Sequence, residues 1–412
     1  MKLSKPRQCA LMVLTDVEKN GAYLNLSLRE KLSGFKMDTR DNALATQLVM
    51  GVTRYKLYLD EFISSLSSVK LKKMSVWILN ILRIGFYSNI FLDKVPVGAT
   101  VNECVNLARR YGHPSSAAFV NALLRASAGK TFEPKEINVK YSYPLWIVEK
   151  WQSENVDDIE ALLRSGNETP PVCVRRNTLV DCPVPDCMTH VKDDLYIYTT
   201  GGSFEGTPWQ KNGAFTVCDG ASQEAVKALE LKRGENVLDL CAAPGGKSAY
   251  AAAIMQNEGA VTACDIYEHK IPIITSTAER LGASIVCARV NDAAVYNREF
   301  EGAFDAVMLD APCSGLGIIR RKPDIKWTKK PEDCFALAKT QLKMLDTAAR
   351  YVKPHGRLSY TTCTISRTEN EENADAFLKE HAEFELMQPY KQLFPHKDNT
   401  DGFFIAVFGR KK

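Results

Sequence analysis

Patterns that define several common protein classes are missing from this sequence of 412 residues. It contains 12 cysteines, but no two of them form a C-x-x-C pair. Cys187 and His190 are the nearest approach to a metal pair, and a zinc site needs about four such ligands. We therefore expect no bound metal. Scattered single cysteines are typical of proteins in a reducing compartment, so we expect a cytoplasmic protein.

Long uninterrupted apolar runs are also missing. The apolar run of residues 10–14 near the start of the chain ends at Asp16, which is too short for a secretory signal. Residues 74–92 are the best membrane candidate, but Arg83 lies at their centre. A central arginine costs about 2.5–3.5 kcal/mol on insertion scales. We therefore predict a buried helix pair here, and no membrane association.

The chain is long enough for two or three domains, and its first 130 residues have helical periodicity. We predict an all-α bundle of six or seven helices over residues 1–130. This region holds 19 Lys and Arg against 9 Asp and Glu, a net charge of +10, which leaves −6 for the remainder of a chain whose net charge is +4. The excess is compatible with binding a polyanion and equally with a solvated helical surface.

Proline and glycine then interrupt the helical pattern, which predicts a linker at residues 131–145. A small mixed α/β subdomain follows at residues 146–215. From residue 216 to residue 412, short apolar strands alternate with helices, which predicts an α/β domain with a doubly wound parallel sheet. Residues 384–390 and 401–412 are expected to form a final strand pair at its edge.

The segment "VLDLCAAPGGKS" (237–248) predicts a strand, a ligand-binding turn and a helix. A phosphate-binding loop would require glycine where Cys241 stands, and the dinucleotide fingerprint G-x-G-x-x-G is missing. The third candidate ligand is S-adenosylmethionine. Asp265 ends the next strand, 19 residues after Gly246, at the offset where an acid meets ribose hydroxyls, and Asp292 ends the third. One such Asp alone is more often a turn cap, but acids at successive strand ends favour a nucleoside ligand.

Two cysteines, Cys313 and Cys363, each lie just beyond a strand-like segment in a loop of small residues. Ligands bind at the carboxyl ends of parallel strands, so both loops are expected to face one crevice. A thiolate that adds to C6 of cytosine makes C5 able to accept a methyl group, which would explain a thiol in a nucleotide fold. The residue pattern leaves open which cysteine is the nucleophile.

Several motifs in this order resemble the Nol1/Nop2/Sun family of RNA cytosine-5 methyltransferases: "LDLCAAPGGKS", "LDAPCSGLGIIRRKPDIKW", "YTTCTISRTENEEN" and "DGFFIAVF". The resemblance covers roughly residues 145–412. The helical front, with "FVNALLRA" near its end, is similar to a NusB-like RNA-binding domain. This pairing resembles the bacterial members of the family that act on 16S ribosomal RNA.

The resemblance implies a Rossmann-like methyltransferase domain after a NusB-like bundle, with S-adenosylmethionine as cofactor and 16S rRNA or a small-subunit precursor as partner. It implies that Cys363 is the nucleophile, that Cys313 helps to release the product, and that Asp310 also bonds the cytosine. We expect a monomer. The cofactor contacts implied are Cys241, Ala242, Ala243, Pro244, Gly245, Gly246, Lys247, Asp265, Asp292 and Asp310.

Basic side chains around one tryptophan in residues 317–330 favour RNA contact over a solvated loop. The RNA contacts that we predict are Arg175, Arg320, Arg321, Lys326 and Trp327. A non-catalytic RNA-binding or ribosome assembly protein on the same scaffold is the alternative function. The presence of both cysteines argues against it, and the non-glycine at Cys241 argues against an ATPase.

Overall fold

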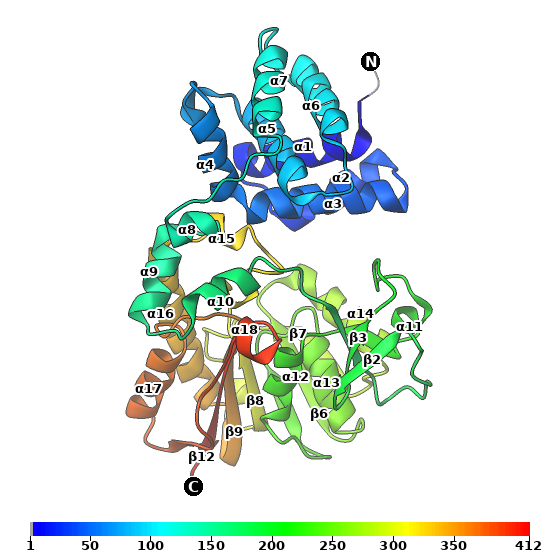
Figure 1. Ribbon diagram of the computed structural model, residues 1–412. Coiled ribbons are helices and arrows are strands. Elements are labelled where there is room, and N and C mark those ends of the chain that lie inside the picture. The colour runs from blue at the N-terminus through cyan, green and yellow to red at the C-terminus, as the bar shows by residue number, and fades with distance from the viewer. Residues whose placement is uncertain (1–2) are drawn as a thin grey trace. The chain divides into compact units, whose positions relative to one another are not determined.

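The computed structural model describes residues 3–412 and divides into two compact units, residues 1–150 and residues 151–412 (Figure 1). The first two residues of the predicted front domain lie outside the described part. The division falls after Lys150. The predicted linker contains the short helix α8 (Ile137–Lys140) and the first residue of α9 (Leu145–Ser153).

The first unit is a bundle of helices built around one hydrophobic core. Helix α5 packs against α1, α3, α4, α6 and α7. The seven helices that form the bundle are α1 (Lys5–Asn20), α2 (Leu24–Phe35), α3 (Thr39–Arg54), α4 (Lys56–Leu66), α5 (Val76–Phe91), α6 (Val97–Tyr111) and α7 (Ser116–Ser127). The predicted all-α fold of this region is therefore confirmed.

Helix α5 is the segment whose hydrophobicity raised the question of a membrane span. It is a single helix rather than the predicted pair, and it is buried as predicted. The guanidinium of Arg83 donates to both carboxylate oxygens of Asp60, at 2.6 and 2.8 Å, and to Glu18 at 2.8 Å. These ion pairs compensate the cost of burying a charge. None of the helices in residues 3–412 is long and apolar enough to cross a bilayer.

The second unit begins with a small antiparallel sheet of strand order β2-β3-β1-β4. The elements of this region are α10 (Ile159–Ser165), β1 (Val172–Arg176), β2 (Met188–Lys192), β3 (Leu195–Tyr198), α11 (Pro208–Lys211) and β4 (Phe215–Val217). Strand β4 pairs with β1 and leads directly into α12 (Gly220–Lys227). The segment between β4 and α12 therefore connects the small sheet to the large one.

The large sheet has the order β10-β12-β9-β8-β5-β6-β7, and β11 pairs with β12. Its strands are β5 (Asn236–Asp239), β6 (Ala260–Asp265), β7 (Val286–Val290), β8 (Phe304–Asp310), β9 (Val352–Thr362), β10 (Phe384–Leu386), β11 (Lys391–Leu393) and β12 (Phe403–Arg410). Strands β5 to β9 are parallel, which confirms the predicted doubly wound sheet. The terminal strand β12 inserts antiparallel between β9 and β10.

Helices cover both faces of this sheet (Figure 1). They are α12, α13 (Gly246–Ile254), α14 (Ile271–Arg280), α16 (Pro331–Ala349) and α17 (Glu371–Glu380). The short helices α15 (Ile325–Thr328) and α18 (Pro395–Asp398) lie in the segments that precede α16 and β12. Val237 packs in the core beside α12 and α13, and its neighbour Leu238 packs in the core beside α16 and α17. Successive side chains of a strand point to opposite faces, so both are buried, each stabilising the fold by about 1.5–3 kcal/mol.

Candidate active site

The carboxyl ends of β5, β8 and β9 bring together segments far apart in the sequence. Strand β8 lies between β5 and β9, so the residues that follow these three strands are neighbours in space. Asp310 is the last residue of β8 and pairs in register with Thr361 of β9. Cys313 and Cys363 follow these two strands by a few residues. The structure therefore places both cysteine loops at one edge of the sheet.

The two thiols are in direct contact. The Sγ atoms of Cys313 and Cys363 are 3.2 Å apart, although 50 residues separate them in the sequence. Burial is the largest cause that raises the pKa of several other thiols, including that of Cys241, where nearby carboxylates raise it further. For Cys313, the hydrogen bond with Cys363 is the largest cause that raises the thiol pKa well above its ordinary value, followed by burial and by nearby negative charge. Cys313 therefore remains a protonated thiol at neutral pH.

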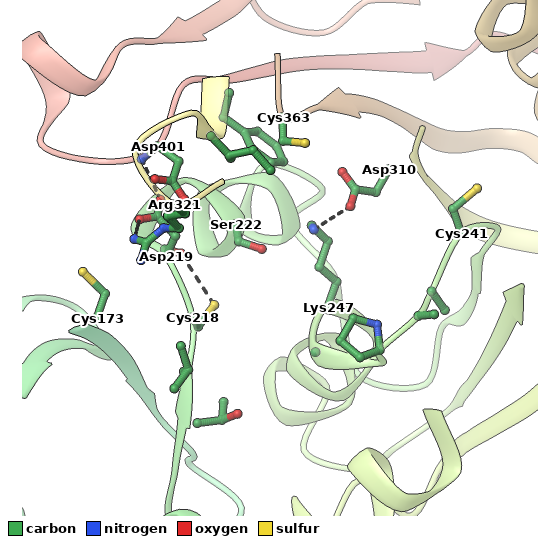
Figure 2. Close-up of a pocket in the computed structure, with 18 of the residues that line it drawn as sticks. Cys173, Cys218, Asp219, Ser222, Cys241, Lys247, Asp310, Arg321, Cys363 and Asp401 are labelled. Carbon is green, nitrogen blue, oxygen red and sulfur yellow. Dashed lines mark hydrogen bonds and ion pairs between the residues drawn. The ribbon is translucent and has the colours of Figure 1, made fainter. Parts of the chain in front are cut away.

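A cavity of about 320 Å³ opens beside the thiols (Figure 2). Cys363 lines it, together with Asp310 and the turn that follows β5. On its opposite side lies Arg321, whose guanidinium donates to Asp401 at 2.6 Å and to Asp219 at 2.8 Å. Both cysteines are partly exposed, but only Cys363 is part of the wall of this cavity.

Lys247 and Asp310 form an ion pair inside this cavity (Figure 2). The Nζ atom of Lys247 is 2.7 Å from Oδ2 of Asp310, and the hydroxyl of Thr361 donates to Oδ1 at 3.0 Å. Burial disfavours the lysine charge, but the carboxylate of Asp310 outweighs it, and the pKa of Lys247 is raised. The cavity therefore offers a fixed cation beside a carboxylate, a donor and an acceptor for a polar ring edge.

The turn after β5 contains a glycine without a side chain to block a ligand from the backbone. Gly245 has φ of 102°, in the left-handed region that favours glycine, and is the N-cap of α13. Cys241, Ala242, Ala243, Pro244, Gly246 and Lys247 all line the cavity. Backbone N–H groups at a helix N-terminus point toward whatever occupies such a turn. The residues that the sequence predicted as cofactor contacts in this segment are thus brought together.

Asp265 ends β6 as predicted, whereas Asp292 lies two residues past the end of β7, and neither is part of the cavity wall. Asp265 accepts from the backbone N–H of Tyr267 at 3.1 Å and from Nζ of Lys270 at 3.3 Å. Asp292 accepts from the backbone N–H of Ala294 at 2.8 Å. Both carboxylates therefore cap turns. Both residues also lie at the carboxyl edge of the sheet, near the ends of β6 and β7.

Sequence reasoning missed Asp239, the last residue of β5. Its side chain lines the cavity, is 1% exposed, and accepts from the hydroxyl of Ser248 at 2.6 Å. Its Oδ1 atom has no hydrogen-bond partner within residues 3–412. Burial raises the pKa of this carboxyl to about 6. The signal was present in the sequence, because Asp239 ends its strand as Asp265 and Asp310 end theirs.

Three of the basic residues predicted to contact RNA are buried. Arg320 donates to Asp401 at 2.7 Å, and Lys326 donates to the side-chain oxygen of Asn167 at 3.1 Å. Arg175 is 1% exposed, with its guanidinium 4.3 Å from the ring centroid of Tyr250. These three side chains are buried in the fold, and their contact with RNA stays a prediction. Sequence gives the charge of a residue, whereas burial depends on the fold.

Arg321 and Trp327 keep partly exposed side chains. Arg321 reaches the cavity, and the ring of Trp327 has Nζ of Lys326 at 5.6 Å from its centroid. The predicted basic loop thus keeps Arg321, Lys322, Lys329 and Lys330 at least partly exposed beside this ring, while Arg320 and Lys326 are buried.

Comparisons with known proteins match both parts of the chain. The profile of the NusB family matches residues 4–128, and that of the 16S rRNA methyltransferase RsmB/F family matches residues 226–409. A probable ribosomal RNA small subunit methyltransferase B of Bacillus subtilis (strain 168) is 36% identical over 447 residues, which cover 100% of both chains. This chain belongs to the small subunit methyltransferase B family.

Other members of this methyltransferase B family are similar over nearly the whole length. The Ribosomal RNA small subunit methyltransferase B of Vibrio vulnificus (strain YJ016) is 30% identical over 97% of this chain and 98% of its own. Among solved structures, that of the protein PH0851 has a TM-score of 0.83 at 26% identity, and the match covers 100% of this chain and 99% of that one. The predicted pairing of a NusB-like bundle with a Rossmann-like methyltransferase domain is confirmed.

Proposed function

We propose that this chain transfers a methyl group from S-adenosylmethionine to C5 of a cytosine in 16S rRNA, through a covalent bond between Cys363 and C6 of the base. One observation carries the proposal. Two thiols 3.2 Å apart lie beside an acid and a lysine, and only one of them, Cys363, lines the cavity. The names of the relatives, which are small subunit rRNA methyltransferases, support the choice of RNA.

The residues around the β5 turn fit S-adenosylmethionine. The cofactor carries a methionine ammonium group, and Asp239 brings a buried carboxylate to the wall of the cavity. The ribose and adenine would extend along the sheet edge to Asp265 and Asp292, where Ile266 and Val290 are exposed apolar side chains. When bound, the cofactor supplies an electrophilic methyl group on its sulfonium.

Asp310 and Lys247 are the residues that would hold the target base. The polar edge of cytosine carries an amino donor beside ring acceptors. The carboxylate of Asp310 can accept from the amino group, and the ammonium of Lys247 can donate to an acceptor. Their mutual 2.7 Å ion pair keeps both side chains in place before the base enters. The base would then lie with C6 toward Cys363.

Cys363 is the nucleophile because it lines the cavity. Addition of its thiolate sulfur to C6 breaks the C5–C6 double bond and makes C5 nucleophilic enough to accept the methyl group. Loss of the C5 proton to a base then re-forms the double bond and expels the Cys363 thiolate. Cys313, a protonated thiol 3.2 Å from the sulfur of Cys363, is positioned to assist this release.

Bisulfite sequencing of 16S rRNA tests the proposal. In a strain that lacks this gene, one cytosine that is protected in the wild type should become convertible. The purified chain with S-adenosylmethionine should restore its protection in vitro, and the Cys363→Ala variant should not. Identical bisulfite conversion patterns in the two strains would refute the proposed cytosine methylation. They would favour the alternative function, a non-catalytic role in ribosome assembly.

A further inference from the structure

A carboxylate that the proposed chemistry does not use lies behind the two thiols. Glu369, in the "SRTENEEN" segment between β9 and α17, is 0% exposed. Its carboxylate accepts three hydrogen bonds. The donors are the backbone N–H of Ser314 at 2.8 Å, the hydroxyl of Ser314 at 2.6 Å and the side-chain amide of Gln341 at 3.0 Å. Two of these three bonds come from the residue that follows Cys313.

The same carboxylate orders a chain of hydroxyl groups that joins the two cysteine loops. Ser314 Oγ is 2.7 Å from the hydroxyl of Thr364, the residue after Cys363. A hydroxyl has one proton to donate, and that of Ser314 goes to Glu369. The bond between the loops must therefore run from Thr364 to Ser314. Thr364 in turn accepts from the backbone N–H of Leu316 at 3.2 Å.

The contacts of Gln341 extend this arrangement to the residue before Cys313. Besides its bond to Glu369, the amide of Gln341 donates to the backbone carbonyl of Pro312 at 2.9 Å. The backbone is thus held on both sides of Cys313. No ion pair in the described part of the chain compensates the charge of Glu369. Burying an unpaired carboxylate is costly, and such a cost is retained mainly where function requires it.

We propose that Glu369 is a positioning residue that clamps the loop of Cys313 to the loop of Cys363 and so sets the separation of the two sulfur atoms. The inference rests on the proposed function, because it assigns the clamp to the step in which the two thiols act in turn. Glu369 touches neither sulfur and acts through Ser314 and Thr364. Its negative charge also adds to the causes that raise the pKa of Cys313, after the hydrogen bond with Cys363 and burial.

The test compares Glu369→Gln with Glu372→Gln in the full-length chain. Glutamine has nearly the same shape, but one accepting oxygen becomes a donating NH2 group. Either the N–H of Ser314 then loses its acceptor, or the Ser314 hydroxyl must accept instead, which reverses its bond with Thr364. Glu372 is exposed in the first turn of α17 and is the matched control. Four properties are measured: thermal unfolding, S-adenosylmethionine affinity by calorimetry, kcat and KM on undermethylated 16S rRNA, and covalent RNA adduct on a denaturing gel.

We expect Glu369→Gln to lower kcat about tenfold or more, the scale of a displaced reacting group. KM and cofactor affinity should stay within about twofold, because ground-state binding does not involve the clamp. The variant should also accumulate an RNA adduct, as Cys313→Ala is expected to do, since release fails while attack persists. Glu372→Gln should behave as the wild type in all four measurements.

Wild-type kcat in Glu369→Gln would overturn the inference, and so would a loss of kcat in proportion to lost folding and cofactor binding. If Glu369→Gln does not fold, Ser314→Ala decides, because it removes the hydroxyl link and leaves the carboxylate bonded to Gln341. An unchanged kcat in Ser314→Ala overturns the proposed role of Glu369. A lowered kcat together with a covalent RNA adduct supports it. A wild-type chain without methylation activity would instead refute the proposed function.

Discussion

The sulfur atoms of Cys313 and Cys363 are in contact, yet the surroundings of the two thiols differ at the scale of single residues. Cys363 lines the cavity with Lys247 and Asp310, whereas Cys313 is not part of the cavity wall. Hydrogen bonding, burial and negative charge keep Cys313 protonated. A thiol held in that form is suited to a release step, and a thiol in the cavity wall is suited to attack.

The first prediction at this scale separates the two roles. Cys363→Ala should show no methylation and no covalent RNA adduct, because the attacking sulfur is gone. Cys313→Ala should block turnover after methyl transfer and give a slow-migrating RNA–protein band on a denaturing gel. The opposite behaviour of the two variants would reverse the assignment. Activity in both variants without an adduct would make the thiols structural.

The second prediction concerns Asp239. Burial raises the pKa of its carboxyl from 3.8 to about 6 in the folded chain. Between these values the folded chain holds a proton that the unfolded chain has lost, so the contribution of Asp239 to the free energy of unfolding falls as pH rises. The loss amounts to about 3 kcal/mol and is complete about one pH unit above the folded-state pKa.

Asp239→Asn should therefore unfold with a weaker pH dependence between about pH 4 and 6 and should be more stable than the wild type at pH 7.5, by about 2 kcal/mol. Denaturant titrations without cofactor, at a series of pH values, measure the difference. The variant should also bind S-adenosylmethionine more weakly, because it lacks the carboxylate charge. If the free energy of unfolding changed with pH in the same way in both proteins, burial would not raise the pKa of Asp239.

At the scale of elements, close backbone contact holds the cysteine loops against β12. Gly317 donates from its N–H to the carbonyl of Cys363 at 3.1 Å, and Gly402 donates to the carbonyl of Gly317 at 2.9 Å. A Cβ atom on Gly317 would lie 2.0 Å from the carbonyl oxygen of Gly402 and 2.9 Å from that of Cys363. Glycine is required here because backbone, not a flexible side chain, occupies the space.

Gly317→Ala should thus destabilise the second unit by about 1–3 kcal/mol, the usual cost of overpacking, and should lower methylation activity by displacing Cys363. Thermal unfolding and methyl transfer from labelled cofactor measure the two effects. Gly34→Ala, where a Cβ atom meets nothing within 4 Å, is the control and should retain full activity. Equal behaviour of the two variants would show that the loop adapts without cost.

At the scale of the whole molecule, charge is divided between the two units. The first 130 residues carry a net charge of +10, and the remainder carries −6. A protein that neutralises phosphates releases counterions, so the logarithm of its affinity falls with the logarithm of salt concentration, more steeply for more contacts. A NusB-like bundle with this excess is suited to hold RNA while the second unit carries out the reaction.

A chain of residues 140–412 should therefore still bind S-adenosylmethionine but bind its RNA more weakly and with a shallower salt slope than the full chain. Calorimetry measures the first property, and filter binding over a series of salt concentrations measures the second. Identical slopes for both proteins would mean that the charge excess of the helical unit is only a solvated surface.

The sequence by itself determined the order of the elements, the doubly wound sheet and the ends of its strands. Apolar periodicity and turn residues are local, and strand ends place Asp310, Cys313 and Cys363 at one edge whatever the details of packing. The sequence also carried the family resemblance in its motifs, and comparison with relatives confirmed the family.

Only the tertiary structure decided which charges are buried and which thiol lines the cavity. Arg175, Arg320 and Lys326 are basic in sequence, but long-range packing buries them. The contact between Cys313 and Cys363, and the clamp of Glu369 on Ser314, join residues about 50 positions apart. Burial and long-range hydrogen bonds depend on distances between elements, which no local pattern of residues specifies.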